Sequence, residues 1–173
     1  MRKFSIALLL VLVFVLSSCV EPSIDYLDFE LNPSIDTIEL NSSYQDPGAV
    51  AKYGFKVLDV EVLSNTVDVT SVGVYEIIYQ ATYGSLIQTL KRIVTVVDET
   101  PPTIELNPGI DTIRVGTEWI DAGVTLSDES LMPIELSVMG DVGENPGLYV
   151  ITYIATDTYG NQAQKDRIVY VIE

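Results

Sequence analysis

The chain of 173 residues contains no histidine, and its single cysteine is Cys19. Catalytic triads of the Ser-His-Asp or Cys-His type need a histidine base, so they are excluded within this chain. Internal disulfides need two cysteines, and zinc sites built from histidine and cysteine are excluded on the same grounds. Carboxylates are numerous enough for an acid–base pair of the glycosidase type, but no spacing singles out one pair. We therefore predict no catalytic residues and no enzymatic activity.

Basic residues are scarce, with 9 Lys and Arg against 25 Asp and Glu and a net charge of −16. Two of the nine, Arg2 and Lys3, lie at the extreme N-terminus, and their removal would leave 7 − 25 = −18. Such a surface repels nucleic acid phosphates and anionic lipid headgroups. We predict no nucleic acid partner and interpret the charge as a solvated surface, with a cationic partner or divalent ions as the alternative.

Residues 4–16 form a run of thirteen mostly apolar residues that directly follows Arg2 and Lys3. A transmembrane helix needs about 20 apolar residues, so the run is too short to span a bilayer comfortably. A basic start followed by an apolar segment of this length is typical of a secretory signal. We expect residues 1–18 to be a helical signal peptide that takes no part in the mature fold.

The signal ends in Leu16-Ser17-Ser18-Cys19, which resembles the lipobox of bacterial lipoproteins. The resemblance implies cleavage before Cys19 and attachment of a diacylglycerol to its thiol. Two or more acyl chains give stable attachment, so the membrane becomes a partner through lipidated Cys19. The expected location is the extracytoplasmic face of the cell membrane, or an outer membrane if the cell has one. An ordinary secretory signal with a coincidental cysteine is the alternative.

The mature chain repeats itself. Residues 31–38 return as residues 106–113 with seven of eight positions identical, an offset of 75 that also relates Arg92 to Arg167. A repeat of this length indicates two copies of one small domain. We place the first domain at residues 29–98 and the second at residues 99–173, with residues 19–28 as an acidic tether in front of them.

Within each copy, short alternating runs rich in Val, Ile, Tyr and Thr are separated by turn residues. This pattern predicts an all-β fold of two tandem antiparallel immunoglobulin-like (Ig-like) sandwiches. Expected strands include residues 35–40, 73–82 and 86–97 in the first copy. In the second copy they include residues 110–115, 119–125 and 148–156.

One strand occurs twice with the frame Gly-x-Tyr-x-Ile-x-Tyr-x-Ala-Thr, beginning at Gly73 and at Gly147. A tyrosine at the start of such a strand predicts a tyrosine corner, in which the hydroxyl bonds to a nearby backbone group. We expect Tyr75 and Tyr149 to form these corners. The isoleucine two positions later should lie in the core.

Three segments of the second copy carry a family resemblance: Thr100-Pro101-Pro102, Asp121-Ala122-Gly123, and the strand from Gly147 with the following turn to Asn161. Together they resemble the bacterial Ig-like surface domains called DUF5011, related to the HYR group, over nearly all of residues 99–173. The first copy departs from that pattern because its last turn lacks the Asp and Asn. The resemblance implies tandem extracellular modules that act as spacers or in adhesion, with protein or glycan partners and no catalysis.

Three aromatic residues, Trp119, Tyr83 and Tyr159, are candidates for ligand binding in a second hypothesis, an extracellular carbohydrate-binding module assisted by calcium. Trp119 could stack on a sugar, although its apolar surroundings favour packing in the core. Tyr83 and Tyr159 lie in the final hairpin turn of each copy, where we expect them to be exposed.

The residues most suited to calcium are Asp157 and Asn161, together with Asp121 or with Asp128 and Glu129. The same residue types serve tight turns, through side-chain caps and positive φ. We favour the turn interpretation, and so predict no metal and no cofactor.

Overall fold

A computed structural model describes residues 21–173; the predicted signal peptide (residues 1–18) and the predicted lipid attachment at Cys19 lie outside this range. The described chain is built from strands, with one short 3-10 helix at Ile24–Tyr26. No helix within residues 21–173 is long and apolar enough to cross a membrane. The all-β prediction is confirmed.

The first domain is a sandwich of a three-stranded sheet, β1-β3-β4, and a four-stranded sheet, β2-β7-β6-β5. All neighbouring strands are antiparallel except β2, which runs parallel to β7. The strands are β1 (Leu27–Leu31), β2 (Thr37–Glu39), β3 (Ala49–Tyr53), β4 (Lys56–Leu58), β5 (Val60–Asn65), β6 (Gly73–Tyr83) and β7 (Leu86–Val97).

The second domain repeats the plan with a two-stranded sheet, β10-β8, and a four-stranded sheet, β11-β12-β13-β9. The parallel pair recurs between β9 and β13. The strands are β8 (Thr103–Leu106), β9 (Thr112–Arg114), β10 (Val124–Ser127), β11 (Glu135–Met139), β12 (Gly147–Thr156) and β13 (Gln162–Ile172). The Ig-like tandem arrangement is therefore present, with a counterpart of β4 missing from the second domain's smaller sheet.

The first strand of each domain changes sheets at an Asn-Pro pair. Asn32-Pro33 follows β1, and Asn107-Pro108 follows β8. Proline has no N–H to donate to a ladder, so the strand leaves its first sheet there and continues beside the last strand in the other sheet. This crossing ties the two layers together at one edge.

The duplicated strand forms the centre of each domain. Within β6, Ile77, Tyr79 and Ala81 alternate into the core, and the equivalent residues of β12 do the same. The predicted tyrosine corners are confirmed: the Tyr75 hydroxyl donates to the Ser71 carbonyl at 2.7 Å, and the Tyr149 hydroxyl donates to the Asn145 carbonyl at 2.8 Å. Each corner fixes the entry of the chain into its central strand.

Two expectations need correction. The tether is shorter than residues 19–28, because β1 begins at Leu27 and Tyr26 already packs edge-on against Tyr53 with ring centroids 6.0 Å apart. Residues 119–123 are not strand, since the Asp121 carboxylate accepts the Gly123 N–H at 2.8 Å and Gly123 has a φ of 71°. This local turn delays the start of β10 to Val124.

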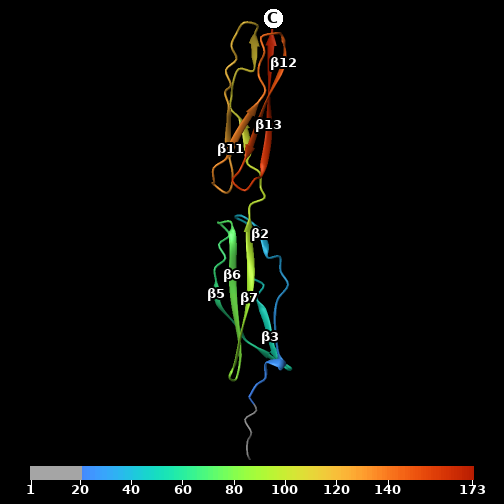
Figure 1. Cartoon of the computed structure of the whole chain (residues 1–173), viewed down its shortest axis with the longest axis vertical. Helices are drawn as coiled ribbons and strands as arrows, with labels where there is room; N and C mark the ends of the chain where they lie inside the picture. Colours follow the sequence, from blue (N-terminus) through green and yellow to red (C-terminus); the bar gives the residue numbers. More distant parts are fainter. Residues whose placement is uncertain (1–20) are drawn as a thin grey trace, which may run out of the picture.

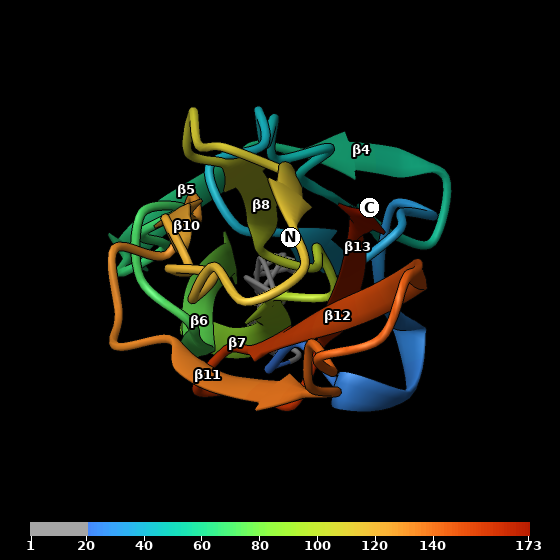
Figure 2. The same ribbon diagram turned by 90° about the horizontal axis from the view of Figure 1, so that it is seen from above.

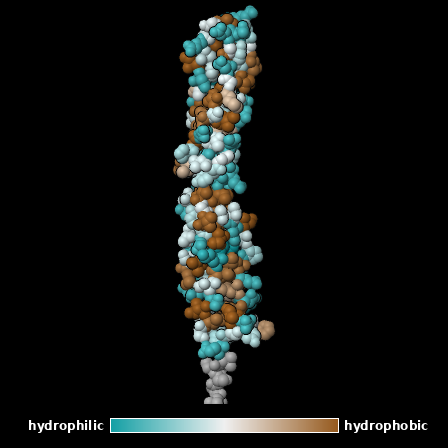
Figure 3. Space-filling view, in the orientation of Figure 1, coloured by the Kyte–Doolittle hydropathy of each residue, from teal (hydrophilic) through white to brown (hydrophobic). Residues whose placement is uncertain are grey.

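The two domains lie end to end along one axis, joined by the short segment after β7 (Figure 1). Along that axis, Figure 2 shows one domain behind the other. In the space-filling view, hydrophobic and hydrophilic residues are intermixed along the whole visible face (Figure 3). The first described residues, from Glu21 onward, and the C-terminus lie at opposite ends of the rod (Figure 1).

Candidate functional site

A buried arginine organises polar contacts inside the first domain. Arg92 on β7 is 1% exposed, and its Nη1 donates to both carboxylate oxygens of Asp36 at 2.9 Å. Its Nη2 donates to the carbonyls of Asn32 and Gly48 at 2.7 and 3.0 Å. A buried charge is tolerated only when paired and fully hydrogen-bonded, and this one is.

The aromatic side of the same network is Tyr79, whose hydroxyl donates to Asp46 at 2.5 Å and accepts from Arg92 Nε at 3.3 Å. Burial and, to a lesser extent, the hydrogen bond to Asp46 together raise the pKa of Tyr79 to about 12. The phenol therefore stays protonated and locked in the core.

The second domain reproduces this network around Arg167, which is 2% exposed and bonds to Asp111, to the carbonyls of Asn107 and Gly123, and to Tyr153. Tyr153 in turn donates to Asp121 at 2.5 Å. Asp121, a sequence candidate for calcium, is thus committed to the core network and to the turn at Gly123. Asp121 is not brought together with Asp157 in any carboxylate group of the described residues.

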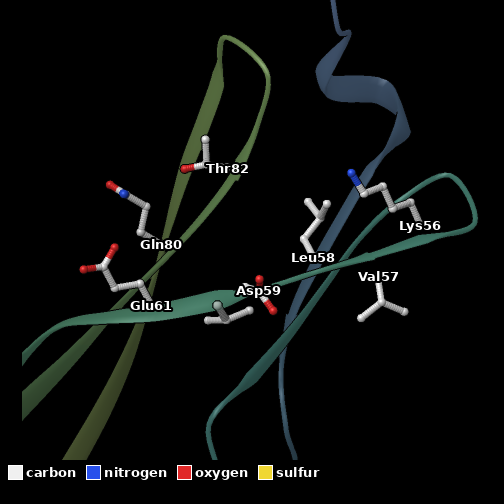
Figure 4. Close-up of a pocket in the computed structure, with 8 residues that line it drawn as sticks. Lys56, Val57, Leu58, Asp59, Glu61, Gln80 and Thr82 are labelled. Atoms are coloured by element: carbon white, nitrogen blue, oxygen red, sulfur yellow. The ribbon is translucent and has the colours of Figure 1, made fainter.

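A shallow hollow lies in the first domain where the chain passes from β4 to β5, and its lining is drawn in Figure 4. Its volume is about 390 Å³, and the side chains of Lys56, Asp59, Glu61 and Gln80 border it. No serine, cysteine or histidine contributes to the lining of this hollow.

A larger hollow of about 720 Å³ lies in the second domain beside Trp119, between the segment following β9 and residues 141–145. Trp119 is half-buried against the core, and its Nε1 donates to the Ile110 carbonyl at 3.1 Å. Glu118, Asp141 and Glu144 also border the hollow. The indole therefore packs against the core and also forms one wall of this open, acidic hollow.

The two candidate tyrosines differ in environment. Tyr83 is the last residue of β6 and is half-buried, stacked on Tyr53 with ring centroids 4.0 Å apart and with Lys56 Nζ 5.1 Å from its ring. The expectation that Tyr83 is exposed is therefore wrong, because the hairpin turn is only Gly84-Ser85. Tyr159 is exposed as expected, in the longer turn between β12 and β13.

That longer turn is held by Asp157, whose carboxylate accepts the N–H groups of Tyr159 and Asn161 and the side-chain amide of Asn161. Burial opposes ionisation, but these hydrogen bonds outweigh it and lower the pKa of Asp157. Asn161 also donates to the Asp98 carbonyl at 3.0 Å. The turn of the second domain is therefore docked on the segment that links the domains.

Carboxylates converge at this junction. One carboxylate oxygen from each of Asp98, Asp128 and Asp157 lies within 4.8 Å of the other two, and Asp98 and Asp157 are only 6% and 7% exposed. A second group, which shares Asp98, adds Glu39 from β2 and the exposed Glu129. We call these five residues the junction cluster.

No basic residue of the described part of the chain pairs with the junction cluster. The ion pairs of residues 21–173 are formed by Lys91, Arg92 and Arg167, and none involves a cluster carboxylate. Two like charges 4.8 Å apart repel by roughly 3 kcal/mol at an effective dielectric constant of about 20. Burial, reinforced by repulsion from Asp128, Asp157 and Glu39, raises the pKa of Asp98.

Sequence reasoning had included Asp128, Glu129 and Asp157 among candidate calcium ligands, but it missed Glu39 and Asp98. In the sequence, Asp98 is only the last residue of the predicted first domain. Its position at the end of β7, followed by Glu99 and two prolines, was the available signal. The sequence contains no such signal for Glu39, because the parallel pairing of β2 with β7 alone brings this residue to the cluster.

Comparison with known families matches residues 108–171 to the family described as bacterial surface protein, Ig-like domain. The matched range runs from the Asn-Pro crossing to the end of β13 and contains Asp111, Asp121 and Arg167. The predicted resemblance of the second domain to bacterial surface Ig-like domains is confirmed. No curated protein matches the chain.

Among solved structures, a human mucin-like protocadherin EC1-2 fragment is 14% identical with a TM-score of 0.37, over 84% of this chain and 98% of that one. The lipoprotein BT2262 from Bacteroides thetaiotaomicron is 14% identical with a TM-score of 0.35, over 83% and 80%. A protocadherin gammaB7 EC3-6 fragment is 18% identical with a TM-score of 0.33, over 80% of this chain and 46% of that one.

Proposed function

Since residues 108–171 match the Ig-like domain of bacterial surface proteins, we propose that this chain is a lipid-anchored cell-surface protein. Its two Ig-like domains serve as a spacer or adhesion module, with the lipid on Cys19 as the attachment. The observation that carries the proposal is the end-to-end arrangement of two repeated domains behind a lipobox (Figure 1).

The geometry supports a role as a spacer. The N-terminal segment enters at one end of the rod and the C-terminus lies at the other, so attachment at Cys19 would project the second domain away from the membrane (Figure 1). Each domain is held internally by its own buried arginine network. The strongly acidic surface would be repelled by anionic lipids, which favours an upright position.

The anchor is tested by replacing Cys19→Ala in the full chain and following the protein in membrane and soluble fractions. We expect the variant to lose its lipid and leave the membrane-bound lipoprotein fraction, as mass spectrometry of the mature N-terminus would record. Ser17→Ala is the matched control, because it keeps a small residue in the lipobox. A Cys19→Ala protein that is still acylated and retained like the control would refute the anchor.

A second candidate function is carbohydrate binding at the hollow beside Trp119. An indole wall with neighbouring carboxylates is the kind of surface on which a sugar ring stacks and forms hydrogen bonds. Calorimetry of the full chain in detergent with soluble glycans would detect it, and Trp119→Phe should weaken binding. Flat titrations for both proteins would leave the spacer role alone.

We propose that neither hollow is catalytic. The hollow beside β4 and β5 is lined by no serine, cysteine or histidine, and the hollow beside Trp119 carries its acids on an open surface. A screen of the full chain with glycoside substrates should show no turnover above that of a Glu118→Gln/Glu144→Gln double variant.

A further inference from the structure

Two carboxylate oxygens in the junction cluster are buried without any hydrogen-bond donor. Within residues 21–173, the buried side-chain polar atoms that lack a partner are Tyr44 Oη, Asp98 Oδ2 and Asp128 Oδ2. Asp98 Oδ1 accepts the Thr100 N–H at 3.2 Å, and Asp128 Oδ1 accepts the Ser130 N–H at 2.9 Å. In both aspartates, one oxygen accepts a backbone N–H in a local turn, and the other oxygen is available to a ligand.

An unpaired buried carboxylate oxygen is unfavourable, and repulsion among three neighbouring carboxylates makes it more so. Asp98 is only 6% exposed, so bulk solvent compensates little for the missing partner. A positively charged ligand that accepts oxygen donors would satisfy both oxygens and neutralise the repulsion. The arrangement of these carboxylate oxygens therefore favours binding of a cation.

We propose that the junction cluster is a calcium site that bridges the two domains, with Asp98, Asp128 and Asp157 as its first ligands and Glu39 and Glu129 beside them. The donors are all oxygens, as calcium prefers, and neither nitrogen nor sulfur is offered. Calcium–oxygen distances are about 2.3–2.6 Å, so oxygens on opposite sides of the ion are about 5 Å apart. One oxygen from each of Asp98, Asp128 and Asp157 lies within 4.8 Å of the other two, a separation compatible with an ion of that size.

The ligands come from both sides of the junction. Glu39 and Asp98 belong to the first domain and the linker, whereas Asp128, Glu129 and Asp157 belong to the second domain. The surrounding polar contacts already cross the same boundary: Asn161 Nδ2 donates to the Asp98 carbonyl, and Asn41 Nδ2 donates to the Glu129 carbonyl at 3.2 Å. Binding of calcium would therefore stiffen the rod at its one joint (Figure 1).

The site is tested by calorimetry and thermal unfolding of the full chain in detergent micelles, after removal of metals with EDTA and titration with CaCl₂ to about 10 mM, since extracellular calcium modules bind at about 0.1–1 mM. We expect saturable binding and a higher unfolding temperature. Asp98→Asn and Asp128→Asn should each weaken calcium affinity at least about tenfold, because each removes one ligand charge. Asp28→Asn, the same change on an exposed residue of β1, should bind calcium as the unmodified chain does.

Hydrogen exchange of residues 98–102 supplies a readout specific to the joint. Calcium should slow exchange there in the unmodified chain and leave it unchanged in Asp128→Asn. In EDTA both variants should unfold at or above the temperature of the unmodified chain, since each relieves repulsion. A flat calcium titration would overturn the proposal, and so would an equal shift with NaCl at matched ionic strength. Unfolding of both variants at lower temperature in EDTA with unchanged calcium affinity would also overturn it. None of these results depends on the lipid anchor.

Discussion

Arg92 and Arg167 show how single residues hold these domains together. Each guanidinium is buried; its Nη1 donates to an aspartate, and its Nη2 donates to two backbone carbonyls. In each domain, one carbonyl belongs to the Asn-Pro crossing and the other to the glycine directly before β3 or β10. One arginine side chain therefore joins its own strand to these two segments. This explains the repeated Asn-Pro-x-Ile-Asp and Asp-x-Gly motifs as partners of one arginine.

Replacement Arg92→Met should destabilise the first domain by about 3–5 kcal/mol, the usual effect of removing one partner of a buried ion pair. The Asn32 carbonyl would lose the Arg92 donor, and Asp36, whose side chain is 33% exposed, would lose its ion-pair partner. Denaturant unfolding measures the loss. Lys91→Met is the matched control, since Lys91 pairs with Glu76 on the surface at 2.8 Å and such pairs contribute less than about 1 kcal/mol. Equal losses in the two variants would contradict the assigned role.

The raised pKa of Tyr79 predicts that the first domain loses stability at alkaline pH. Its pKa is about 12 in the folded protein because burial and the bond to Asp46 favour the neutral phenol, against about 10 when unfolded. The unfolded state therefore loses its proton first, and stability present below pH 10 is lost as pH rises toward 12. Each pKa unit corresponds to about 1.4 kcal/mol, so the loss is about 2–3 kcal/mol.

Tyr79→Phe removes this titration. Its unfolding free energy should fall less between pH 9 and pH 12 than that of the unmodified chain, when both are followed by circular dichroism in denaturant. Tyr75→Phe serves as control, because Tyr75 is a corner residue that bonds to the Ser71 carbonyl and not to a carboxylate. Parallel pH curves for Tyr79→Phe and the unmodified chain would contradict the interpretation.

At the scale of elements, the second domain depends on the close approach of β11's end to β12. Gly140 follows β11 with a φ of 100°, and a Cβ there would lie 2.3 Å from the Val150 carbonyl oxygen. A side chain would meet both an unfavourable backbone conformation and a clash with backbone. Gly140 is therefore required where β11 leaves the sheet.

Gly140→Ala should destabilise the second domain by about 3 kcal/mol, the sum of about 1–2 kcal/mol for the left-handed backbone and about 1–3 kcal/mol for overpacking. Gly116→Ala separates the two effects, since Gly116 has a φ of 80° but no atom within 4 Å of its added Cβ. It should lose only about 1 kcal/mol. Thermal unfolding measures both, and a smaller loss for Gly140→Ala than for Gly116→Ala would contradict the packing argument.

At the scale of the molecule, each domain has its own sheets and its own arginine network. Within residues 21–173 no sheet contains strands of both domains. The hydrogen bonds across the joint are few, including Asn161 to Asp98 and Asn41 to Glu129. The domains should therefore unfold separately when calcium is absent.

The arginine variant tests this separation. In EDTA, Arg92→Met should increase hydrogen exchange in β6 and β7 while leaving β12 and β13 as protected as in the unmodified chain. A loss of protection in both domains would mean that they unfold as one unit. Calcium at saturating concentration should partly couple them, because its proposed ligands lie on both sides of the joint.

Much of the fold could be predicted because its signals are local. Alternating apolar residues identified the strands, Gly-x-Tyr identified the corners, and the offset of 75 residues identified the duplication. Trp119 was correctly expected to pack against the core. Exposure of Tyr83 was mispredicted because it depends on Tyr53, a partner thirty residues away that stacks on it.

The sequence by itself determined an all-β chain of two repeated Ig-like domains, because strand periodicity, turn residues and the repeat depend on neighbours along the chain. The tertiary structure decided which acids work together. Asp121 lies at the edge of the core, where it bonds to Tyr153 and lies near Arg167, whereas Glu39 and Asp98 lie with Asp128 and Asp157 at the joint. Carboxylates from four separate places in the chain meet there only because β2 pairs with β7 and the turn at Asn161 docks on the linker.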